Sequence, residues 1–500
     1  MLQERTLCRY LFELAQNQPG KKLVSDENGW ISASGLLQKS LLVCNELKNF
    51  GIHFGDIVAL KADRSLPILA AIFGIRLAGG IVLLCGPYGE PEDTLRNCQI
   101  PIPAACCVSE GADGALWISS KRFSRQILQE RNSWFQPEIS RSELLRSEPL
   151  LLELSFPEDA DLPGFIIFTS GSTGQRKAVM LSDRNLIANL LDSAPLGDYR
   201  EDDIALGVLP LEHVFGLVLA AGVVVLHYAM FLSRKNDVTS ILSAIEQEKI
   251  TRMNGVPSLY QAMAKEADHF DLSSLRSGFI GGAPVTPEQF RDMERTLGMT
   301  LISVYGMSEC IGISCSNYRE AFQVRCSTAG KVYPHNTVYI VGEDGKKLPA
   351  GECGEIWVNG PSRMAGYWPY CMDPEEFFPT GDLGYLTGDG HLVLTGRKKD
   401  IIIRNGNNIS PARIESAMLS LAGVCAAAVV GLPDEKQGEV PYAMVAGNSD
   451  WEKLKELLPK NQLPAGILCV QELPMTPSGK ADKQKIRELL LDWLRKRTCC

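Results

Sequence analysis

One segment, residues 165–181, decides how the sequence is interpreted; it reads Phe165-Ile-Ile-Phe-Thr-Ser-Gly-Ser-Thr-Gly-Gln-Arg-Lys-Ala-Val-Met-Leu181. Its two apolar ends predict buried strands, before and after a loop that contains two glycines, four hydroxyl side chains and Lys177. Glycines let backbone N–H groups turn toward an anion, hydroxyl groups add donors, and a lysine adds positive charge. The loop therefore predicts a phosphate site without the GxxxxGK[ST] spacing of a P-loop, although such a loop is also often a plain flexible turn.

Outward from this loop, short apolar runs alternate with helical patterns. Such runs occur between Gly35 and Pro101 and again between Ile204 and Ser308. This alternation predicts an α/β fold with mostly parallel sheets covered by helices. The longest apolar run, Gly216 to Leu232, is slightly short for a membrane span and contains His227. It predicts a buried helix followed by a buried strand, so we expect no transmembrane segment.

The pattern changes after residue 336. The segment Thr337 to Val358 has short alternating strands joined by glycine turns, which predicts a small antiparallel or barrel-like unit. The charged run Arg397-Lys-Lys-Asp400 then precedes about a hundred residues with an α+β pattern of their own. We therefore expect a large N-terminal domain (1–396), a hinge (397–400) and a small mobile C-terminal domain (401–500).

Composition narrows the class of protein. The 500 residues carry a formal charge of −9, which argues against a nucleic-acid or anionic-membrane binder. The 15 cysteines are scattered, with no CxxC pair and no zinc-ligand spacing, and the N-terminus lacks a signal-peptide pattern. Reduced thiols and a cytoplasmic location are expected. No upstream context supports lipidation of Cys499 and Cys500.

The loop at residues 168–177 resembles the TSG[ST]TG-x-P-K-G signature of the adenylate-forming superfamily. This family includes acyl- and aryl-CoA synthetases, luciferases and the adenylation domains of peptide synthetases. Further segments resemble the family's other motifs, in the family's order and over nearly the whole chain. They are Leu209–Gly216, Gly281–Pro284, Tyr305–Glu309, Thr380–Asp382, Gly396–Asp400 with Gly406 and Glu415, and Pro474–Lys480.

The resemblance implies an ATP site and a Mg²⁺ ion. Glu309 would ligate the Mg²⁺, a hard cation suited to carboxylate and phosphate oxygens. Asp382 would accept the ribose hydroxyls, Arg397 would donate to the ribose, and Ser308 would contact the α-phosphate. The full nucleotide-binding set that the resemblance implies is Thr169, Ser170, Gly171, Ser172, Thr173, Gly174, Lys177, Gly282, Ala283, Pro284, Tyr305, Gly306, Ser308, Asp382 and Arg397.

Three residues are expected to be catalytic: Lys480, His213 and Glu309. By resemblance, Lys480 reaches across the domain interface to the carboxylate and α-phosphate oxygens, and Lys399 is the hinge that absorbs the rotation. By the same resemblance, Gly406 would let the arm that carries the acceptor thiol approach the backbone closely. His213 would line and gate the acid pocket. Taken singly, each side chain has an ordinary interpretation, a solvated lysine or a structural histidine, and only the whole set favours catalysis.

The sequence departs from the family pattern at several positions. Arg176 stands where the family usually has Pro, and Ala178 where it has Gly. Val304 replaces a common Gly before the Tyr-Gly pair, which should narrow the acid pocket and favour a planar aromatic or modest aliphatic acid. Glu212-His213 replaces the Phe-Asp of amino-acid-activating relatives, so amino-acid substrates are disfavoured.

The resemblance implies an AMP-forming ligase that activates a fatty or aromatic carboxylic acid with ATP and then forms a thioester with coenzyme A. One alternative is transfer to the phosphopantetheine of a carrier protein, acting in trans because neither end of the sequence carries a carrier domain. Another is a non-catalytic adenylate binder. The retained Lys177, Glu309, Asp382 and Lys480 speak against the latter.

Overall fold

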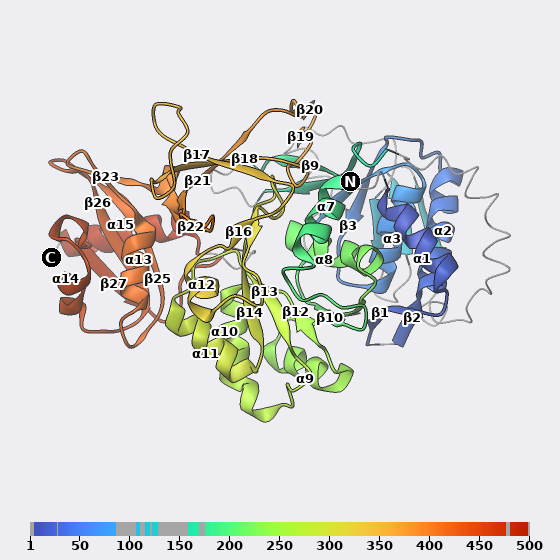
Figure 1. Cartoon of the computed structure of the whole chain (residues 1–500), viewed down its shortest axis with the longest axis horizontal. Coiled ribbons are helices and arrows are strands. Elements are labelled where there is room, and N and C mark those ends of the chain that lie inside the picture. Colours follow the sequence, from blue (N-terminus) through green and yellow to red (C-terminus); the bar gives the residue numbers. More distant parts are fainter. Residues whose placement is uncertain are drawn as a thin grey trace.

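The structure is a computed structural model that describes residues 5–27, 29–86, 107–110, 116–120, 123–128, 159–169, 176–476 and 481–498. The described strands form two nine-stranded sheets, one four-stranded sheet and one five-stranded sheet. Figure 1 shows the N-terminal helices at one end of the molecule and the last hundred residues at the other.

The first nine-stranded sheet has the order β16-β15-β14-β13-β12-β10-β11-β1-β2. Its central strands pair in parallel, and antiparallel pairs occur at its two edges. The strands are β1 Lys22–Asp26, β2 Gly29–Ser32, β10 Ile204–Gly207, β11 Ala229–Leu232, β12 Arg252–Met253, β13 Ser277–Ile280, β14 Thr300–Tyr305, β15 Ser314–Cys315 and β16 Lys331–Val332.

The second nine-stranded sheet has the order β20-β19-β9-β8-β4-β3-β5-β6-β7. Only β5-β3-β4-β8 pair in parallel, because hairpins extend the sheet at both edges. The strands are β3 Ile57–Lys61, β4 Ile81–Cys85, β5 Cys107–Glu110, β6 Leu116–Ser120, β7 Phe123–Leu128, β8 Pro163–Phe168, β9 Ala178–Ser182, β19 Gly366–Tyr367 and β20 Tyr370–Cys371.

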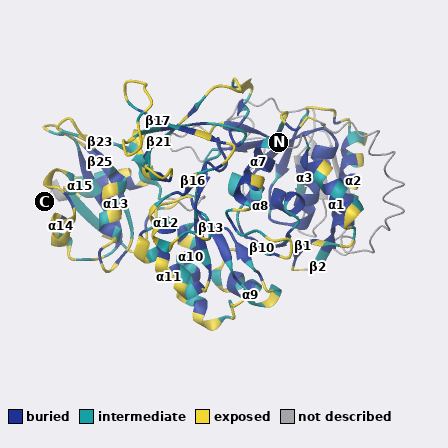
Figure 2. Ribbon diagram, in the orientation of Figure 1, coloured by how far each residue is buried: buried dark blue, intermediate teal, exposed yellow. Residues whose placement is uncertain are grey.

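Helices between these sheets form the main hydrophobic core with strands from both of them. Helix α3 is buried along its whole length because its side chains are apolar apart from Arg76, which pairs with the buried Asp183 at 3.3 Å, and Ser65 caps its first turn. Figure 2 shows this buried interior in dark blue. The helices are α1 Leu7–Asn17, α2 Ala33–Asn49, α3 Leu66–Leu77, α7 Asp183–Ser193 and α8 Val214–Val225.

The other face of the first sheet has a separate core. Helix α11 begins with a capping box at Thr286 and buries Phe290, Met293 and Leu297 against that core. The helices on this side are α9 Val238–Glu248, α10 Pro257–Glu266, α11 Pro287–Leu297 and α12 Phe322–Ser327.

The four-stranded sheet is antiparallel in the order β17-β18-β21-β22, and its last strand leads directly into the 3-10 turn η3. Beyond it, a five-stranded sheet has its own two hydrophobic clusters, drawn from residues 402–490. The elements are β17 Thr337–Val341, β18 Gly354–Asn359, β21 Phe378–Leu386, β22 Leu392–Arg397, η3 Lys398–Asp400, β23 Ile402–Arg404, β24 Asn407–Ile409, α13 Pro411–Leu419, β25 Val424–Asp434, β26 Gly438–Gly447, β27 Gly466–Val470 and α15 Lys483–Thr498; the short elements between β26 and β27 are η4 Trp451–Lys453, α14 Leu454–Leu457 and η5 Lys460–Gln462.

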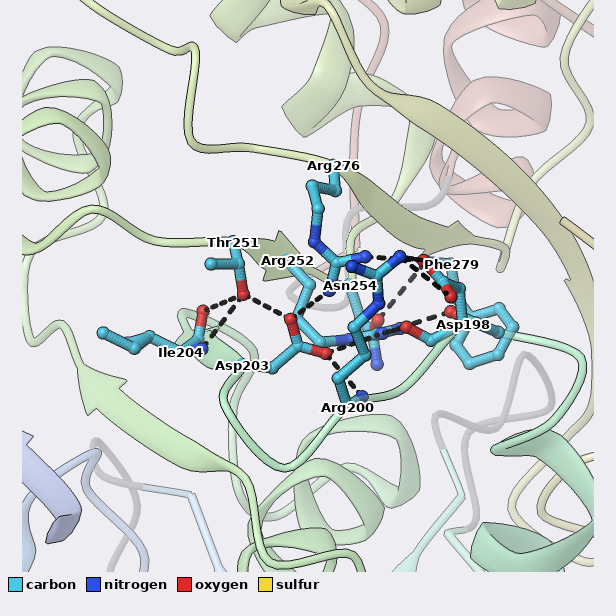
Figure 3. Close-up of polar contacts among 10 residues, drawn as sticks. Asp198, Arg200, Asp203, Ile204, Thr251, Arg252, Asn254, Arg276 and Phe279 are labelled. Carbon is cyan, nitrogen blue, oxygen red and sulfur yellow. Dashed lines mark hydrogen bonds and ion pairs between the residues drawn. The ribbon is translucent and has the colours of Figure 1, made fainter.

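A buried ionic network holds the amino ends of β10, β12 and β13 together (Figure 3). Arg252 and Asp203 are almost fully buried, with 3.5 Å between guanidinium and carboxylate. Arg276 forms one ion pair with Asp203 and another with Asp198, the latter at 2.5 Å. The Thr251 hydroxyl donates to Asp203 at 2.6 Å. These charges lie at the amino ends of the strands, whereas ligands usually bind at the carboxyl ends. We therefore assign the network a structural role.

Several sequence predictions are confirmed. The run Gly216 to Leu232 forms most of helix α8 and then strand β11, and the run after the glycine loop forms β9. Thr337–Val341 and Gly354–Asn359 are antiparallel partners. Among the described residues, no helix combines the length and apolarity needed to cross a membrane. The cytoplasmic location and the domain limits at residues 397–400 stay predictions.

Candidate active site

Three predicted motifs follow strands of the first sheet at the same edge. Gly281–Pro284 comes directly after β13, Gly306–Glu309 follows β14, and His213 lies beyond the end of β10. These strands run in parallel through β12, so their carboxyl ends meet. The carboxyl edge of an open parallel sheet is where ligands usually bind.

The glycine loop connects β8 and β9, which form a hairpin. Thr169 donates its N–H to the carbonyl of Lys177 at 3.0 Å, and the N–H of Lys177 donates to Thr169 Oγ1 at 3.2 Å. These bonds bring the two ends of the loop together. Residues 170–175, which include the predicted Ser170, Gly171, Ser172, Thr173 and Gly174, lie outside the described part of the chain.

Lys177 and Glu309 are connected through Tyr367. The Lys177 ammonium lies 4.6 Å from the centre of the Tyr367 ring, and the Tyr367 hydroxyl donates to Glu309 Oε1 at 2.8 Å. Burial, followed by the Glu309 charge, raises the pKa of Tyr367. Two predicted residues, one from each nine-stranded sheet, thus meet at one aromatic side chain that the sequence analysis missed.

The backbone places Glu309 firmly. Its carboxylate is largely buried, and its carbonyl accepts the N–H of Met364 at 2.7 Å. Strand β19 pairs with β9, which puts Tyr367 beside Val179 and therefore close to Lys177. Across the described ranges, no group of three or more His, Cys, Asp or Glu side chains could hold a metal ion without other ligands.

Asp382 is held by two donors from different sheets. The Tyr305 hydroxyl donates to Asp382 Oδ2 at 2.8 Å, and Arg397 Nε lies 2.8 Å from Oδ1. Strand β21 pairs with β22 so that Asp382 lies opposite Arg397. Burial and the Asp382 charge raise the pKa of Tyr305. Three predicted nucleotide-binding residues are therefore in direct contact.

Two positions at this edge favour glycine, one for its backbone conformation and one for lack of space. Gly282 has φ +89°, a left-handed value that other residues rarely adopt. A Cβ on Gly306 would lie 1.7 Å from the carbonyl oxygen of Ile311. Ala283, Pro284 and Gly306 are exposed and Ser308 is half-buried at the same edge, so a ligand can reach them.

An apolar cluster lies beside these motifs. Phe279 and Ile302 pair across β13 and β14, and Phe215 and Val304 pack against the same cluster. His213 takes the N-cap position of α8. One turn later, Gly216 lies so close to the Pro210 carbonyl that a Cβ at this position would clash with it. The sequence analysis did not single out the aromatic residues of this cluster, because each resembles an ordinary core side chain.

The predicted hinge has ion pairs on both sides. Lys398 pairs with Glu355 of β18 at 2.9 Å, while Asp400 lies 3.3 Å from Lys483 at the start of α15. Lys483 also lies 3.1 Å from Glu415. Lys399, between Lys398 and Asp400, is part of η3.

The last two predicted positions belong to the C-terminal part of the chain. Gly406 has φ +77° and, with Asn405 at φ +50°, forms the tight turn between β23 and β24. Lys480 lies outside the described residues. On either side of its segment, Met475 and Ala481 form a β-bridge, and the N–H of Asp482 donates to the carbonyl of Pro474 at 2.8 Å.

Known proteins resemble this chain along nearly all of its length. Residues 11–368 match the model of the AMP-binding enzyme family, and residues 413–480 match that of the AMP-binding enzyme C-terminal domain. An indoleacetate–CoA ligase of Aromatoleum aromaticum is 35% identical, covering 97% of this chain and 98% of its own. A feruloyl-CoA synthase of Amycolatopsis is 34% identical over 89% and 91%. The crystal structure of ATP-bound MatB from Rhodopseudomonas palustris superposes with a TM-score of 0.81 at 25% identity, over 97% and 98% of the two chains.

Proposed function

The chain belongs to the AMP-binding enzyme family, and we propose that it activates an aromatic carboxylic acid with MgATP and transfers the acyl group to coenzyme A. It is an acid–thiol ligase that forms an acyl-adenylate, releases pyrophosphate and then makes a CoA thioester. The choice of an aromatic acid and the roles of individual residues are our proposals.

The Lys177–Tyr367–Glu309 connection carries the assignment of the phosphate site. Attack of a carboxylate on the α-phosphate, with pyrophosphate leaving, gathers negative charge, so fixed positive groups and donors do most of the catalytic work. Lys177 lies at the end of a hydroxyl-rich loop and is exposed, so its ammonium can bind the β,γ-phosphates. Tyr367 contacts both Lys177 and Glu309, and this supports placing Glu309 beside the same phosphates.

The residues present fit a Mg²⁺ ion bound together with ATP. Mg²⁺ commonly binds one or two carboxylates plus substrate phosphates and water, rather than a cage made of protein alone. Glu309 offers one such carboxylate beside the phosphate loop. The ion would neutralise charge on the phosphates during transfer.

The ribose and adenine would bind at the carboxyl edge of the first sheet. Asp382 is a buried acceptor between Tyr305 and Arg397, which suits sugar hydroxyl groups. The exposed backbone of Gly282–Pro284 can face the base. Lys480 would complete adenylation after a rotation of the C-terminal part at residues 397–400, and Gly406 would then face the thiol arm. This movement is the general hinge mechanism in which a few residues absorb large φ/ψ changes.

The apolar cluster beside the predicted nucleotide motifs supports an aromatic substrate. Phe215, Phe279 and Val304 form an apolar wall beside the Tyr305–Glu309 segment. Aromatic rings pack well against such a wall. The named relatives that act on indoleacetate and ferulate agree with this choice.

A substrate screen tests the proposal. Pyrophosphate release would be measured with indole-3-acetate, ferulate, dodecanoate and phenylalanine, each with CoA or with a phosphopantetheine-loaded carrier protein. We expect release and thioester formation with the aryl acids and CoA. Preference for dodecanoate would overturn the aromatic assignment, and transfer only to the carrier protein would overturn the choice of CoA.

A matched pair of lysine variants tests the catalytic assignment. Lys480→Ala should lower acid-dependent pyrophosphate release at least 100-fold, while thioester formation from a synthetic acyl-adenylate and CoA should persist. The control is Lys485→Ala, because Lys485 is exposed and pairs only with Glu488 of its own helix within the described part of the chain. Equal effects of the two variants would remove Lys480 from the mechanism.

A further inference from the structure

Arg64 connects the two nine-stranded sheets. The residue is 6% exposed and lies in the loop between β3 and α3. Its Nη1 donates to the carbonyl of Val208, the first residue after β10. Its Nη2 donates to the carbonyl of Arg234 at 3.0 Å and to the side-chain oxygen of Asn236, both in the segment after β11. One buried guanidinium of the second sheet therefore binds the segments that follow two neighbouring strands of the first sheet.

Strand directions place these contacts at the carboxyl edges of both sheets. Strands β10 and β11 are parallel, so their carboxyl ends lie side by side. In the second sheet, β3 is parallel to β4 and β4 to β8, and β8 leads into the glycine loop. Arg64 follows the carboxyl end of β3, so it belongs to the same edge of that sheet as the glycine loop. It therefore joins the edge of the proposed phosphate site to the end of β10.

The segment that follows β10 is closely folded on itself. Val208 directly precedes the predicted motif Leu209–Gly216, which contains His213. The N–H of His213 donates to the carbonyl of Pro210 at 3.2 Å, and the N–H of Gly216 donates to the carbonyl of His213 at 3.0 Å. A Cβ at Gly216 would lie 2.2 Å from the Pro210 carbonyl oxygen. A shift at Val208 would therefore carry His213 with it.

Glu212 gives this motif a second contact with the second sheet. Its Oε1 lies 3.4 Å from the position that a Cβ on Gly86, the residue after β4, would take. Its Oε2 is buried and has no hydrogen-bond partner within the part of the chain that the structure describes. Burial raises the pKa of Glu212, while the positive charge of Arg64 acts in the opposite direction. Arg64 thus holds the motif through a backbone carbonyl and also stabilises a carboxylate inside it.

We propose that Arg64 is a positioning residue for acid activation, which fixes the motif Leu209–Gly216, and with it His213, relative to the glycine loop. The proposal rests on the proposed function, in which the acid binds beside His213 and attacks ATP held by that loop. Arginine suits this role because its planar guanidinium presents several donors in a fixed fork, whereas lysine carries a point charge on a flexible stem. A misplacement of about 1 Å can lower a reaction rate about 100-fold.

The proposed nucleotide contacts have supports of their own. Asp382 is held by Tyr305 and Arg397. Lys177 and Glu309 meet at Tyr367. None of these contacts involves Arg64. Loss of its guanidinium should therefore impair the use of the acid far more than the binding of MgATP.

The test is Arg64→Lys in acid-dependent pyrophosphate release. We expect kcat/KM for the acid at saturating MgATP to fall at least about ten-fold, and KM for MgATP at saturating acid to change less than about two-fold. Asn236→Ala removes one acceptor of the same guanidinium, so it should lower kcat/KM for the acid about two- to ten-fold in the same pattern. Asn236 is exposed, so we expect this variant to fold.

The matched control is Arg252→Lys, because Arg252 is also buried but lies at the amino ends of the strands. It should lower the melting temperature and leave kcat/KM for the acid within about two-fold of wild type.

Three results would overturn the positioning role: a fall of less than about two-fold for the acid in Arg64→Lys, equal effects on acid and MgATP, or the same pattern in Arg252→Lys. If the melting temperature shows that Arg64→Lys has lost its fold, Asn236→Ala decides. If no acid supports pyrophosphate release in wild type, the proposed function fails, and the positioning role fails with it.

Discussion

Replacing Tyr367 by Phe removes one hydroxyl group and leaves the ring in place. The wild-type hydroxyl donates to the Glu309 carboxylate at 2.8 Å, and the ring lies below the Lys177 ammonium. A hydrogen bond to a charged group contributes about 1.5–3 kcal/mol. If this bond orients Glu309 for Mg²⁺, its loss should lower kcat/KM for MgATP about 12- to 160-fold.

A second substitution separates the ring from the hydroxyl. Tyr367→Leu also removes the cation–π contact with Lys177, which at an exposed site is worth about 0.5–1 kcal/mol. We therefore expect a further loss of about two- to five-fold. The assay is acid-dependent exchange between ATP and pyrophosphate, measured over a range of Mg²⁺ concentrations at saturating acid, and the Phe variant should require more Mg²⁺ for half-maximal rate.

Tyr370→Phe is the matched control. Tyr370 pairs with Tyr367 in the same hairpin, and the residue is 79% exposed. We expect this variant to behave as wild type. A Tyr367→Phe enzyme within two-fold of wild type at every Mg²⁺ concentration would refute the reasoning, as would an equal loss in Tyr370→Phe.

Three further predictions concern stability and backbone geometry. Arg252→Met leaves the buried Asp203 carboxylate without one of its cations and should destabilise the fold by about 3–5 kcal/mol; urea unfolding measures this, and a change below about 1 kcal/mol contradicts it. Gly306→Ala places a methyl group against the Ile311 carbonyl and should lower the free energy of unfolding by about 1–3 kcal/mol, with loss of pyrophosphate release in any folded fraction. Normal activity with an unchanged melting temperature would contradict this prediction. Burial raises the pKa of Glu212, so the folded state holds its proton more tightly than the unfolded state and the contribution to stability falls as the pH rises above the usual carboxyl range. The melting temperature of Glu212→Gln should therefore gain on wild type between pH 5 and pH 8, whereas a constant difference over that range would exclude the effect.

Local patterns in the sequence were sufficient for the elements that flank the site. The two apolar runs around the glycine loop are strands because each has the length and composition of a buried strand, and the run after His213 is long enough for a helix and a strand. The motifs then fall at strand ends, as the resemblance implies. Periodicity describes neighbours along the chain, so it predicts such elements well.

Contacts between distant residues could not be predicted in this way. Tyr367 meets Glu309 and Lys177 only because β19 joins the edge of the second sheet at β9, and no local pattern encodes that pairing. The buried pair Arg252 and Asp203 is a similar case, since charged residues are usually exposed and only the packing of the strands encloses them.

The carboxylate of Asp382 shows a consequence of a buried acceptor that has hydrogen-bond partners within the protein. Its two oxygens have partners in Tyr305 and Arg397, so the buried carboxylate does not depend on a ligand for its hydrogen bonds. In the proposed role, an arriving sugar must exchange with or share those partners, and the net gain from binding is smaller than two new bonds would suggest. A smaller gain would also weaken the binding of AMP, so the product nucleotide would leave more readily after each turnover.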